Sequence, residues 1–146
     1  MIKDEYIFKS DRLGFREWSK NDLEEFLKLN SDEEVMEHFP KILSKEEVEE
    51  FIEKLKNHFE KNGYTYYAIE ILDEKEFIGM IGIAFQEYQT KFTPAIDIGW
   101  RLKKSAWGKG YATEGAKRCL KYAFDELGID KIISVCTIKN QKSENV

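Results

Sequence analysis

The residues best suited to chemistry in this sequence form a short turn of small side chains that runs from Trp107 to Thr113. Gly108, Gly110 and Ala112 within it allow the backbone to turn sharply and to approach a ligand closely. An apolar series at helical spacing follows, so the first amides of that helix would face the ligand with the positive end of the helix dipole behind them. Such a turn is typical of a phosphate site and requires no reactive side chain.

Basic residues gather around the same turn. Residues 101–121 include seven lysines and arginines and a single acid, Glu114, although the whole chain carries a net charge of −5. This local excess would focus a positive field on the turn. A plainer interpretation stays open, in which Lys103, Lys104 and Lys121 form a solvated face and the glycines only make a tight turn.

Two well-known phosphate loops do not match this turn. The chain has no G-x-x-x-x-G-K-[ST] motif, which excludes a P-loop. The dinucleotide motif G-x-G-x-x-G also fails, because Thr113 takes the place of its third glycine and no acidic partner for the ribose can be placed. We therefore expect a phosphate-bearing cofactor of another kind.

The elements on both sides of the turn would position it. Ala95 to Leu102 is expected to be a strand, and Gly99 in its interior indicates a bulge or a close approach by a ligand. A helix follows the turn and ends at Gly128, and a further strand is expected from Lys131 to Ile138. The inward face of that helix is predicted to consist of Ala112, Gly115, Ala116, Cys119, Leu120, Ala123, Phe124 and Leu127.

The first half of the chain supplies the remaining expected elements. Without a repeat or a Gly/Ser linker, the sequence predicts one α/β unit over residues 1–146. Gly79 and Gly82 indicate a bend or close packing within the second strand of a hairpin. The expected elements are a strand from Tyr6 to Arg16, a short helix after the N-cap Ser19, a helix from the capping box Ser44–Glu47 to Gly63, and a hairpin of strands Tyr64–Leu72 and Glu76–Glu87.

Composition limits the class of protein. A chain of 146 residues with 42% hydrophobic residues has enough apolar side chains for one globular core, and more than a disordered segment has. Its 35% of charged residues is too high for a membrane protein. The excess of 28 acidic over 23 basic residues argues against a general nucleic-acid binder. The longest apolar run, Ile78 to Phe85, is too short to span a bilayer, and we expect a cytoplasmic protein without a membrane partner.

Histidine and cysteine give little sign of chemistry. His38 and His58 have no cysteine or acidic residue at metal-ligand spacing, so no metal site is expected. Cys119 and Cys136 lie in segments typical of a helix and a strand, where a free thiol behaves as a small buried hydrophobe. Cys119 is not expected to carry an acyl group, because its helical neighbours are apolar.

Two stretches together resemble a known family, the GNAT-fold N-acetyltransferases. Residues 98–102 followed by 107–115 look like its acetyl-coenzyme A motif, and residues 11–18 with Asp22 and 32–36 are similar to the opening of its ribosomal-protein (RimJ/RimL-like) branch. The resemblance covers nearly the whole chain. It implies an α+β fold with a mixed, mostly antiparallel central sheet flanked by helices, and acetyl-coenzyme A as cosubstrate. The implied cofactor residues are Trp100, Arg101, Leu102, Trp107, Gly108, Lys109, Gly110, Tyr111, Ala112, Thr113 and Asn140.

The chain departs from the family pattern at two places. Trp107 stands where the motif usually begins with Gln or Arg, although an aromatic residue is common there in this branch. Asn140 and Ser143 match an Asn and a Ser that follow the fifth strand in the family, but the further helix and strands are lacking because the chain stops at Val146. We therefore expect a GNAT domain that is short at its C-terminus.

The implied reaction defines which groups to look for. Acetyl transfer to an amine needs an unprotonated nitrogen, a donor for the developing oxyanion and an acid for the leaving thiolate. Asp97 is the candidate base, with a solvated strand residue as the alternative. Ser143, the second catalytic candidate, and Asn140 would bind the pantetheine or thioester. Backbone amides between Ile98 and Trp100 would stabilise the oxyanion.

Three functions follow from these patterns. The leading one is an N-acetyltransferase that transfers acetyl to a protein N-terminal amine or a small-molecule amine by direct attack in a ternary complex. The second is a non-catalytic module that binds coenzyme A, and the third is an interaction domain without a cofactor. The acidic stretch from Glu46 to Glu53 is either a hint of a cationic acceptor or a solvated helix face. Exposed strand edges would favour a homodimer.

Overall fold

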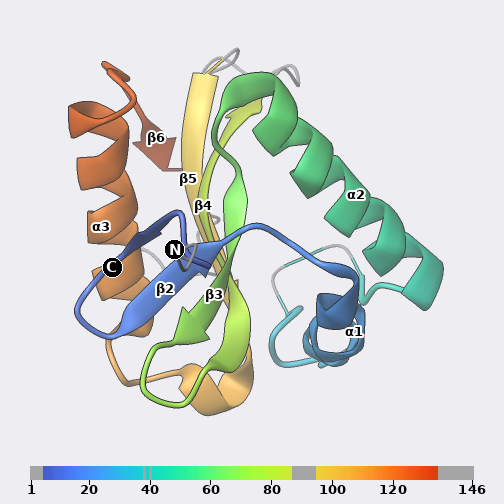
Figure 1. The fold of residues 1–146 in the computed structure, drawn as a ribbon. Coiled ribbons are helices and arrows are strands. Elements are labelled where there is room, and N and C mark those ends of the chain that lie inside the picture. The colour runs from blue at the N-terminus through green and yellow to red at the C-terminus, as the bar shows by residue number, and fades with distance from the viewer. Residues whose placement is uncertain (1–4, 38, 40, 87–94, 135–146) are drawn as a thin grey trace.

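A computed structural model describes residues 5–37, 39, 41–86 and 95–134. Its centre is one sheet with strand order β1-β2-β3-β4-β5-β6 (Figure 1). Each pair from β1 to β5 is antiparallel, and β6 pairs with β5 in parallel. The mixed, mostly antiparallel sheet flanked by helices is therefore confirmed. The strands are β1 Phe8–Lys9, β2 Leu13–Arg16, β3 Tyr66–Ile71, β4 Glu76–Gln86, β5 Ala95–Leu102 and β6 Ile133–Ser134.

Helices cover both faces of this sheet (Figure 1). Helices α1 (Leu23–Asn30) and α2 (Lys45–Asn62) bury one apolar cluster with the sheet, and α3 (Tyr111–Asp125) buries a second cluster on the opposite face. The predicted capping box starts α2, where the Ser44 hydroxyl accepts from the Glu47 amide at 3.2 Å and the Glu47 carboxylate accepts from the Ser44 amide at 3.0 Å. None of the described helices has the length and apolar character needed to cross a bilayer.

The expected single strand from Tyr6 to Arg16 is wrong. The chain makes a hairpin there, in which β1 and β2 pair with Phe8 opposite Phe15. Ser10 closes the turn: its amide donates to the Leu13 carbonyl at 2.9 Å, and its hydroxyl accepts from the Leu13 amide at 3.2 Å. A short polar side chain that bonds the backbone three residues on is a turn signal.

The prediction for α3 is confirmed except at Phe124 and at the end of the helix, which is Asp125 and not Gly128. Gly115, Ala116, Cys119 and Ala123 are buried against the sheet, whereas the Phe124 side chain is 45% exposed. One helical step of 100° separates it from Ala123 and turns it to the outer face. Gly115 fits this close contact, because a Cβ atom would lie 2.3 Å from Ile81 Cδ1 and the buried Ile81 side chain would have to shift. Small residues thus bring α3 close to the sheet.

The strand glycines serve close packing. A Cβ on Gly79 or Gly82 would lie 2.1 Å from a backbone carbonyl of the neighbouring strand, and the pairing of β3 with β4 shifts register beside Gly79. Gly99 makes no bulge against β4, because the register from Gly79 to Gln86 runs unbroken and pairs Gly82 with Gly99. Its missing side chain instead makes room for the Tyr66 ring, 3.3 Å from the site of a Cβ atom. The prediction of a bulge at Gly99 is therefore wrong for the pairing of β5 with β4.

Candidate functional site

The glycine turn joins β5 to α3 through a short 3-10 turn at Lys104–Ala106. Gly108 and Gly110 have φ angles of +74° and +82°, which other residues rarely adopt, so both positions require glycine. The first helical bond of α3 runs from the Glu114 amide to the Gly110 carbonyl at 3.0 Å. The amides of residues 111–113 precede that bond and have no acceptor within the helix. The turn therefore presents backbone donors at a helix N-terminus, as the sequence predicts.

Trp107 is the first residue of the turn, and the end of β5 holds its side chain in place. Its indole Nε1 donates to the Leu102 carbonyl at 2.9 Å, while 38% of the residue stays exposed. Beyond it, the Cβ site of Gly108 has no heavy atom within 4 Å. The surface above Gly108 is therefore open to a ligand that approaches the backbone.

The hairpin of β1 and β2 braces the turn through Arg12 and Ser10. The Glu114 carboxylate accepts from the Ser10 hydroxyl at 2.5 Å, the Arg12 amide at 2.8 Å and Arg12 Nε at 2.6 Å. The Arg12 guanidinium also donates to the Lys109 carbonyl at 3.0 Å and covers the Tyr111 ring at 4.4 Å. Sequence reasoning missed this clamp, because its partners lie about a hundred residues apart.

The clamp also sets the charge of Glu114. Burial by itself raises the pKa of this carboxyl, but the hydrogen bonds from Ser10 and Arg12 outweigh burial, and the pKa is lowered. Glu114 is therefore ionised at neutral pH, and its carboxylate holds Arg12 over the turn.

The basic excess around the turn is partly neutralised. Lys103 pairs with Glu76 at 2.5 Å and Lys104 with Glu34 at 2.7 Å. Arg118 donates to the Lys9 carbonyl at 2.6 Å and lies over the Phe8 ring. The field at the turn is consequently weaker than the residue count indicates, and the backbone amides matter more.

Strand β5 divides its side chains between the two faces of the sheet. Ile96, Ile98, Trp100 and Leu102 pack with the cluster under α3. By the alternation of a strand, Asp97, Gly99 and Arg101 belong to the face covered by α1 and α2. The candidate base and Arg101 therefore share one face, and the side chain of Arg101 points away from the α3 side.

Asp97 is buried, with 8% of its surface exposed, so the alternative of a solvated strand residue is wrong. Its Oδ1 accepts from the Tyr66 hydroxyl at 2.5 Å, and Gln86 Nε2 donates to the same hydroxyl at 3.1 Å. Burial raises the pKa of Asp97, with these hydrogen bonds acting in the opposite direction. His58 lies nearby and accepts from the Phe85 amide through Nε2 at 3.2 Å; burial lowers its pKa.

The contacts of Arg101 with the described residues are all with neutral groups. Its Nη1 donates to Asn30 Oδ1 at 2.5 Å, and its guanidinium covers the Phe39 ring at 4.1 Å and the Phe51 ring at 5.5 Å. Its Nε is buried without a hydrogen-bond partner. Burial lowers the pKa of Arg101 to about 10, so it stays a cation at neutral pH.

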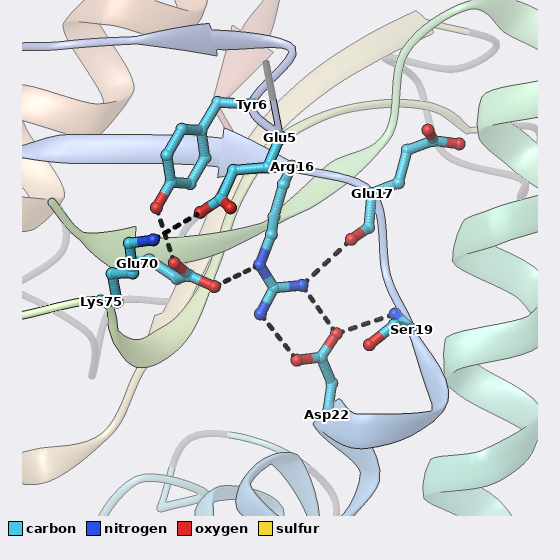
Figure 2. A network of polar contacts seen from close by, with 8 residues as sticks. All are labelled: Glu5, Tyr6, Arg16, Glu17, Ser19, Asp22, Glu70 and Lys75. Carbon is cyan, nitrogen blue, oxygen red and sulfur yellow. Dashed lines mark hydrogen bonds and ion pairs between the residues drawn. The ribbon is translucent and has the colours of Figure 1, made fainter. Parts of the chain in front are cut away.

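The opening motif of the sequence builds a different, fully paired site. Figure 2 shows the Arg16 guanidinium between Glu70 of β3 and Asp22, which precedes α1. Arg16 Nε donates to Glu70 at 2.5 Å, and Nη1 and Nη2 donate to the two Asp22 oxygens at 2.9 and 2.7 Å. Tyr6 donates to Glu70 at 2.7 Å, and the Ser19 amide donates to Asp22 at 2.8 Å. This network ties β2, β3 and the start of α1 together.

Two predicted site residues, Asn140 and Ser143, lie outside the described residues, as does Cys136. Cys119 is a buried free thiol, and burial raises its pKa, in keeping with an inert core residue. Among the described residues, no three His, Cys, Asp or Glu side chains are grouped to hold a metal ion.

Comparison with known proteins decides the family. A family model described as an acetyltransferase (GNAT) domain matches residues 12–146. This chain belongs to the GNAT acetyltransferase family. Among GNAT relatives, the uncharacterized N-acetyltransferase YnaD of Bacillus subtilis is 31% identical over 137 residues, which cover 92% of this chain and 75% of that protein. The narrower RimJ/RimL-like branch stays a prediction.

Solved GNAT structures agree with this fold. The GNAT acetyltransferase from Bacillus anthracis has a TM-score of 0.77 at 28% identity, covering 94% of this chain and 77% of its own. Spermidine N-acetyltransferase from Vibrio cholerae, solved with CoA and spermine, has a TM-score of 0.71 at 23% identity, covering 92% and 76%. That likeness shows the fold alone.

Some curated relatives match over less of their length. The match to the FsC-acetyl coenzyme A-N(2)-transacetylase of Aspergillus fumigatus has 35% identity and covers 50% of this chain and 33% of that protein. The match to the uncharacterized protein YkkB of Bacillus subtilis has 31% identity and covers 62% of this chain and 52% of that protein. The acceptor and full activity of this chain are therefore matters for proposal.

Proposed function

We propose that this protein is an acetyl-coenzyme A-dependent N-acetyltransferase that acetylates an amine by direct attack in a ternary complex. The observation that carries the proposal is the turn at the start of α3, where two left-handed glycines and open backbone amides lie in a chain of the GNAT family. A coenzyme A diphosphate suits such a turn, because helix N-terminal amides bind phosphate oxygens. The residues present thus fit the cofactor.

Individual residues receive roles from this geometry. The backbone of residues 108–113 would hold the diphosphate, and Trp107 and Tyr111 would border it. The backbone of residues 100–102 would bind the pantetheine, with Asn140 as a further partner. The cosubstrate supplies an acetyl thioester, and attack by the amine nitrogen forms the new C–N bond as the C–S bond breaks and coenzyme A leaves.

Asp97 is the proposed base. A raised pKa makes a carboxylate a better proton acceptor, and Tyr66 holds its Oδ1 in place. Asp97 would take the proton that the amine loses as it attacks. Ser143 is proposed to hydrogen-bond the thioester or the leaving sulfur. We keep a cytoplasmic location, a single domain over residues 1–146 and a possible homodimer as predictions.

The acceptor class is an amine. The spermidine N-acetyltransferase that shares this fold supports a small amine, and the resemblance to ribosomal-protein acetyltransferases supports a protein N-terminus. The exposed acids of α2 give no further direction, because Glu47 is used by the helix cap and by Lys41 at 2.7 Å.

Titration of acetyl-coenzyme A into wild type and two glycine variants tests the cofactor site. Gly108→Glu places a negative side chain over the turn, and Gly128→Glu is the matched control at the other end of α3. Both glycines have left-handed φ angles, +74° and +68°, and open space at their Cβ sites. We expect binding by wild type and the control, and at least tenfold weaker binding by Gly108→Glu. Equal binding by both variants would contradict the proposal.

A further inference from the structure

Strand β5 carries two charges of opposite sign on the face toward α1 and α2, a buried Asp97 and a partly buried Arg101. Asp97 and Arg101 are four residues apart on one extended strand, which places their Cα atoms about 13 Å apart. Gly99 lies between them, and the Tyr66 ring occupies the space beside it. At this separation the two charges cannot form an ion pair with one another.

Arg101 has no carboxylate partner among the residues that the structure describes. Its fixed contacts are the Asn30 amide oxygen and the Phe39 and Phe51 rings, and its Nε is buried without an acceptor. A buried cation in a neutral surrounding is costly unless an anion joins it. Nε belongs to the edge of guanidinium that carboxylates engage in bidentate fashion.

Asp97, in turn, lacks a cationic partner among the described residues. In the described part of the chain its partners are the neutral groups of Tyr66 and Gln86. His58 interacts with Asp97, and burial lowers the pKa of His58 and so disfavours its charged form. A protonated amine that arrives at Asp97 would therefore meet a buried carboxylate without a competing cation among the described residues.

We propose that the acceptor carries a carboxylate in addition to its amine, and that Arg101 binds this carboxylate while Asp97 faces the amine. The inference rests on the proposed acetyltransferase function and narrows its substrate class to amino acids and peptides with a distal carboxylate. Asn30, fixed by its own bond to the Phe26 carbonyl at 2.7 Å, holds the guanidinium in position. Polyamines are poor acceptors in this account, because a second cation would meet Arg101.

Three probe amines of matched chain length test the assignment by thiol release: 6-aminohexanoate, 1,6-diaminohexane and hexylamine. Wild type is expected to show kcat/KM at least tenfold higher for 6-aminohexanoate than for the diamine, because only the carboxylate can accept a charge-assisted hydrogen bond from Arg101. Arg101→Gln is expected to bring this ratio close to one, and Arg101→Lys to keep part of it. Ratios within one variant are independent of how much of it is folded.

Arg118→Gln is the matched control. Arg118 also covers an aromatic ring, that of Phe8 at 5.0 Å, but it lies on α3, and its loss should leave the ratio unchanged. Equal use of the three amines, a preference for the diamine, or an unchanged ratio in Arg101→Gln would overturn the inference and leave the acetyltransferase intact. Failure of wild type both to bind coenzyme A and to release thiol would overturn the proposed function and the inference with it.

Discussion

Two partly buried arginines of this protein have opposite surroundings. Arg16 of β2 is enclosed by Asp22 and Glu70, which supply an anion to each side of its guanidinium (Figure 2). In the part of the chain that the structure describes, Arg101 of β5 contacts the neutral amide of Asn30 and the rings of Phe39 and Phe51. The Arg16 network therefore has all its ionic partners within the chain, as expected of a structural network. The face of β5 instead carries an arginine and a carboxylate whose ionic partners a ligand could supply.

The effect on protonation has opposite sign at the two sites. Burial alone lowers the pKa of Arg16, but hydrogen bonds to Asp22 and Glu70 outweigh it, and the pKa is raised. At Arg101 burial is opposed only weakly, and the pKa falls to about 10. Ion pairing thus stabilises the first cation, and the second stays charged at a cost to folding.

Removal of Arg16 should give the largest loss of stability. Arg16→Met leaves the buried Asp22 carboxylate and the partly buried Glu70 carboxylate without a cation, and we expect a loss of about 3–5 kcal/mol in the free energy of unfolding. Urea denaturation measures it, with Arg118→Met as a control that should lose far less. A loss of under 1 kcal/mol for Arg16→Met would break the comparison, because the network would then not be structural.

Asp97→Asn should act on catalysis while it spares the fold. Loss of a general base lowers the rate of acetyl transfer by about 100-fold, with unchanged affinity for acetyl-coenzyme A. Thiol release and titration on the same preparation separate the two effects. A variant that acetylates amines at the wild-type rate would remove Asp97 from the mechanism.

The same variant has a pH signature in stability. Because folding raises the pKa of Asp97, its ionised form is disfavoured in the folded state, and Asn in its place should raise the melting temperature at pH 7. The gain should shrink as the pH falls through the raised pKa and vanish below about 3.9, the pKa of an unfolded aspartate. A gain that persists at pH 3 would show that it does not come from ionisation.

Tyr66→Phe should give a smaller effect on the same pair. The Tyr66 hydroxyl stabilises the Asp97 carboxylate, so its loss should raise the pKa of Asp97 further and shift the acidic limb of the pH–rate profile to higher pH. We expect less than a tenfold change in the maximal rate. An unshifted profile would mean that the hydrogen bond does not control the ionisation of Asp97.

Arg101→Met should give the smallest change in stability. Methionine removes a cation that lacks an anion but leaves the buried Asn30 Oδ1 without its donor, so we expect a loss of about 1–2 kcal/mol in the free energy of unfolding. Parallel urea titrations with Arg16→Met make the contrast direct. A loss as large as that of Arg16→Met would mean that Arg101 is a structural residue after all.

The sequence predicted the features that depend on local geometry. The capping box at Ser44 and the left-handed Gly63 bound α2 as expected, because each acts within one helical turn. The glycine turn was found for the same reason. Phe124 and the hairpin at Ser10 were missed, since periodicity alone does not fix the edge of a helix face or a turn inside an apolar run.

Long-range features were beyond the sequence. Glu114 pairs with Arg12 over 102 positions, and Arg101 reaches Asn30 over 71. No local pattern encodes which side chains meet when the sheet forms. Asp97 was found as a candidate through its strand and the family resemblance. Its partner Tyr66 became evident only from the register of the sheet, in which Tyr66 of β3 pairs with Gly82 of β4 and Gly82 pairs with Gly99 of β5.

The most direct test of the account is thiol release from acetyl-coenzyme A by the purified wild-type protein, with and without an amine. We predict release that depends on the amine, saturates with it and yields the acetylated amine by mass spectrometry. Binding of acetyl-coenzyme A without amine-dependent release for any acceptor would contradict the account and identify a non-catalytic coenzyme A-binding module instead.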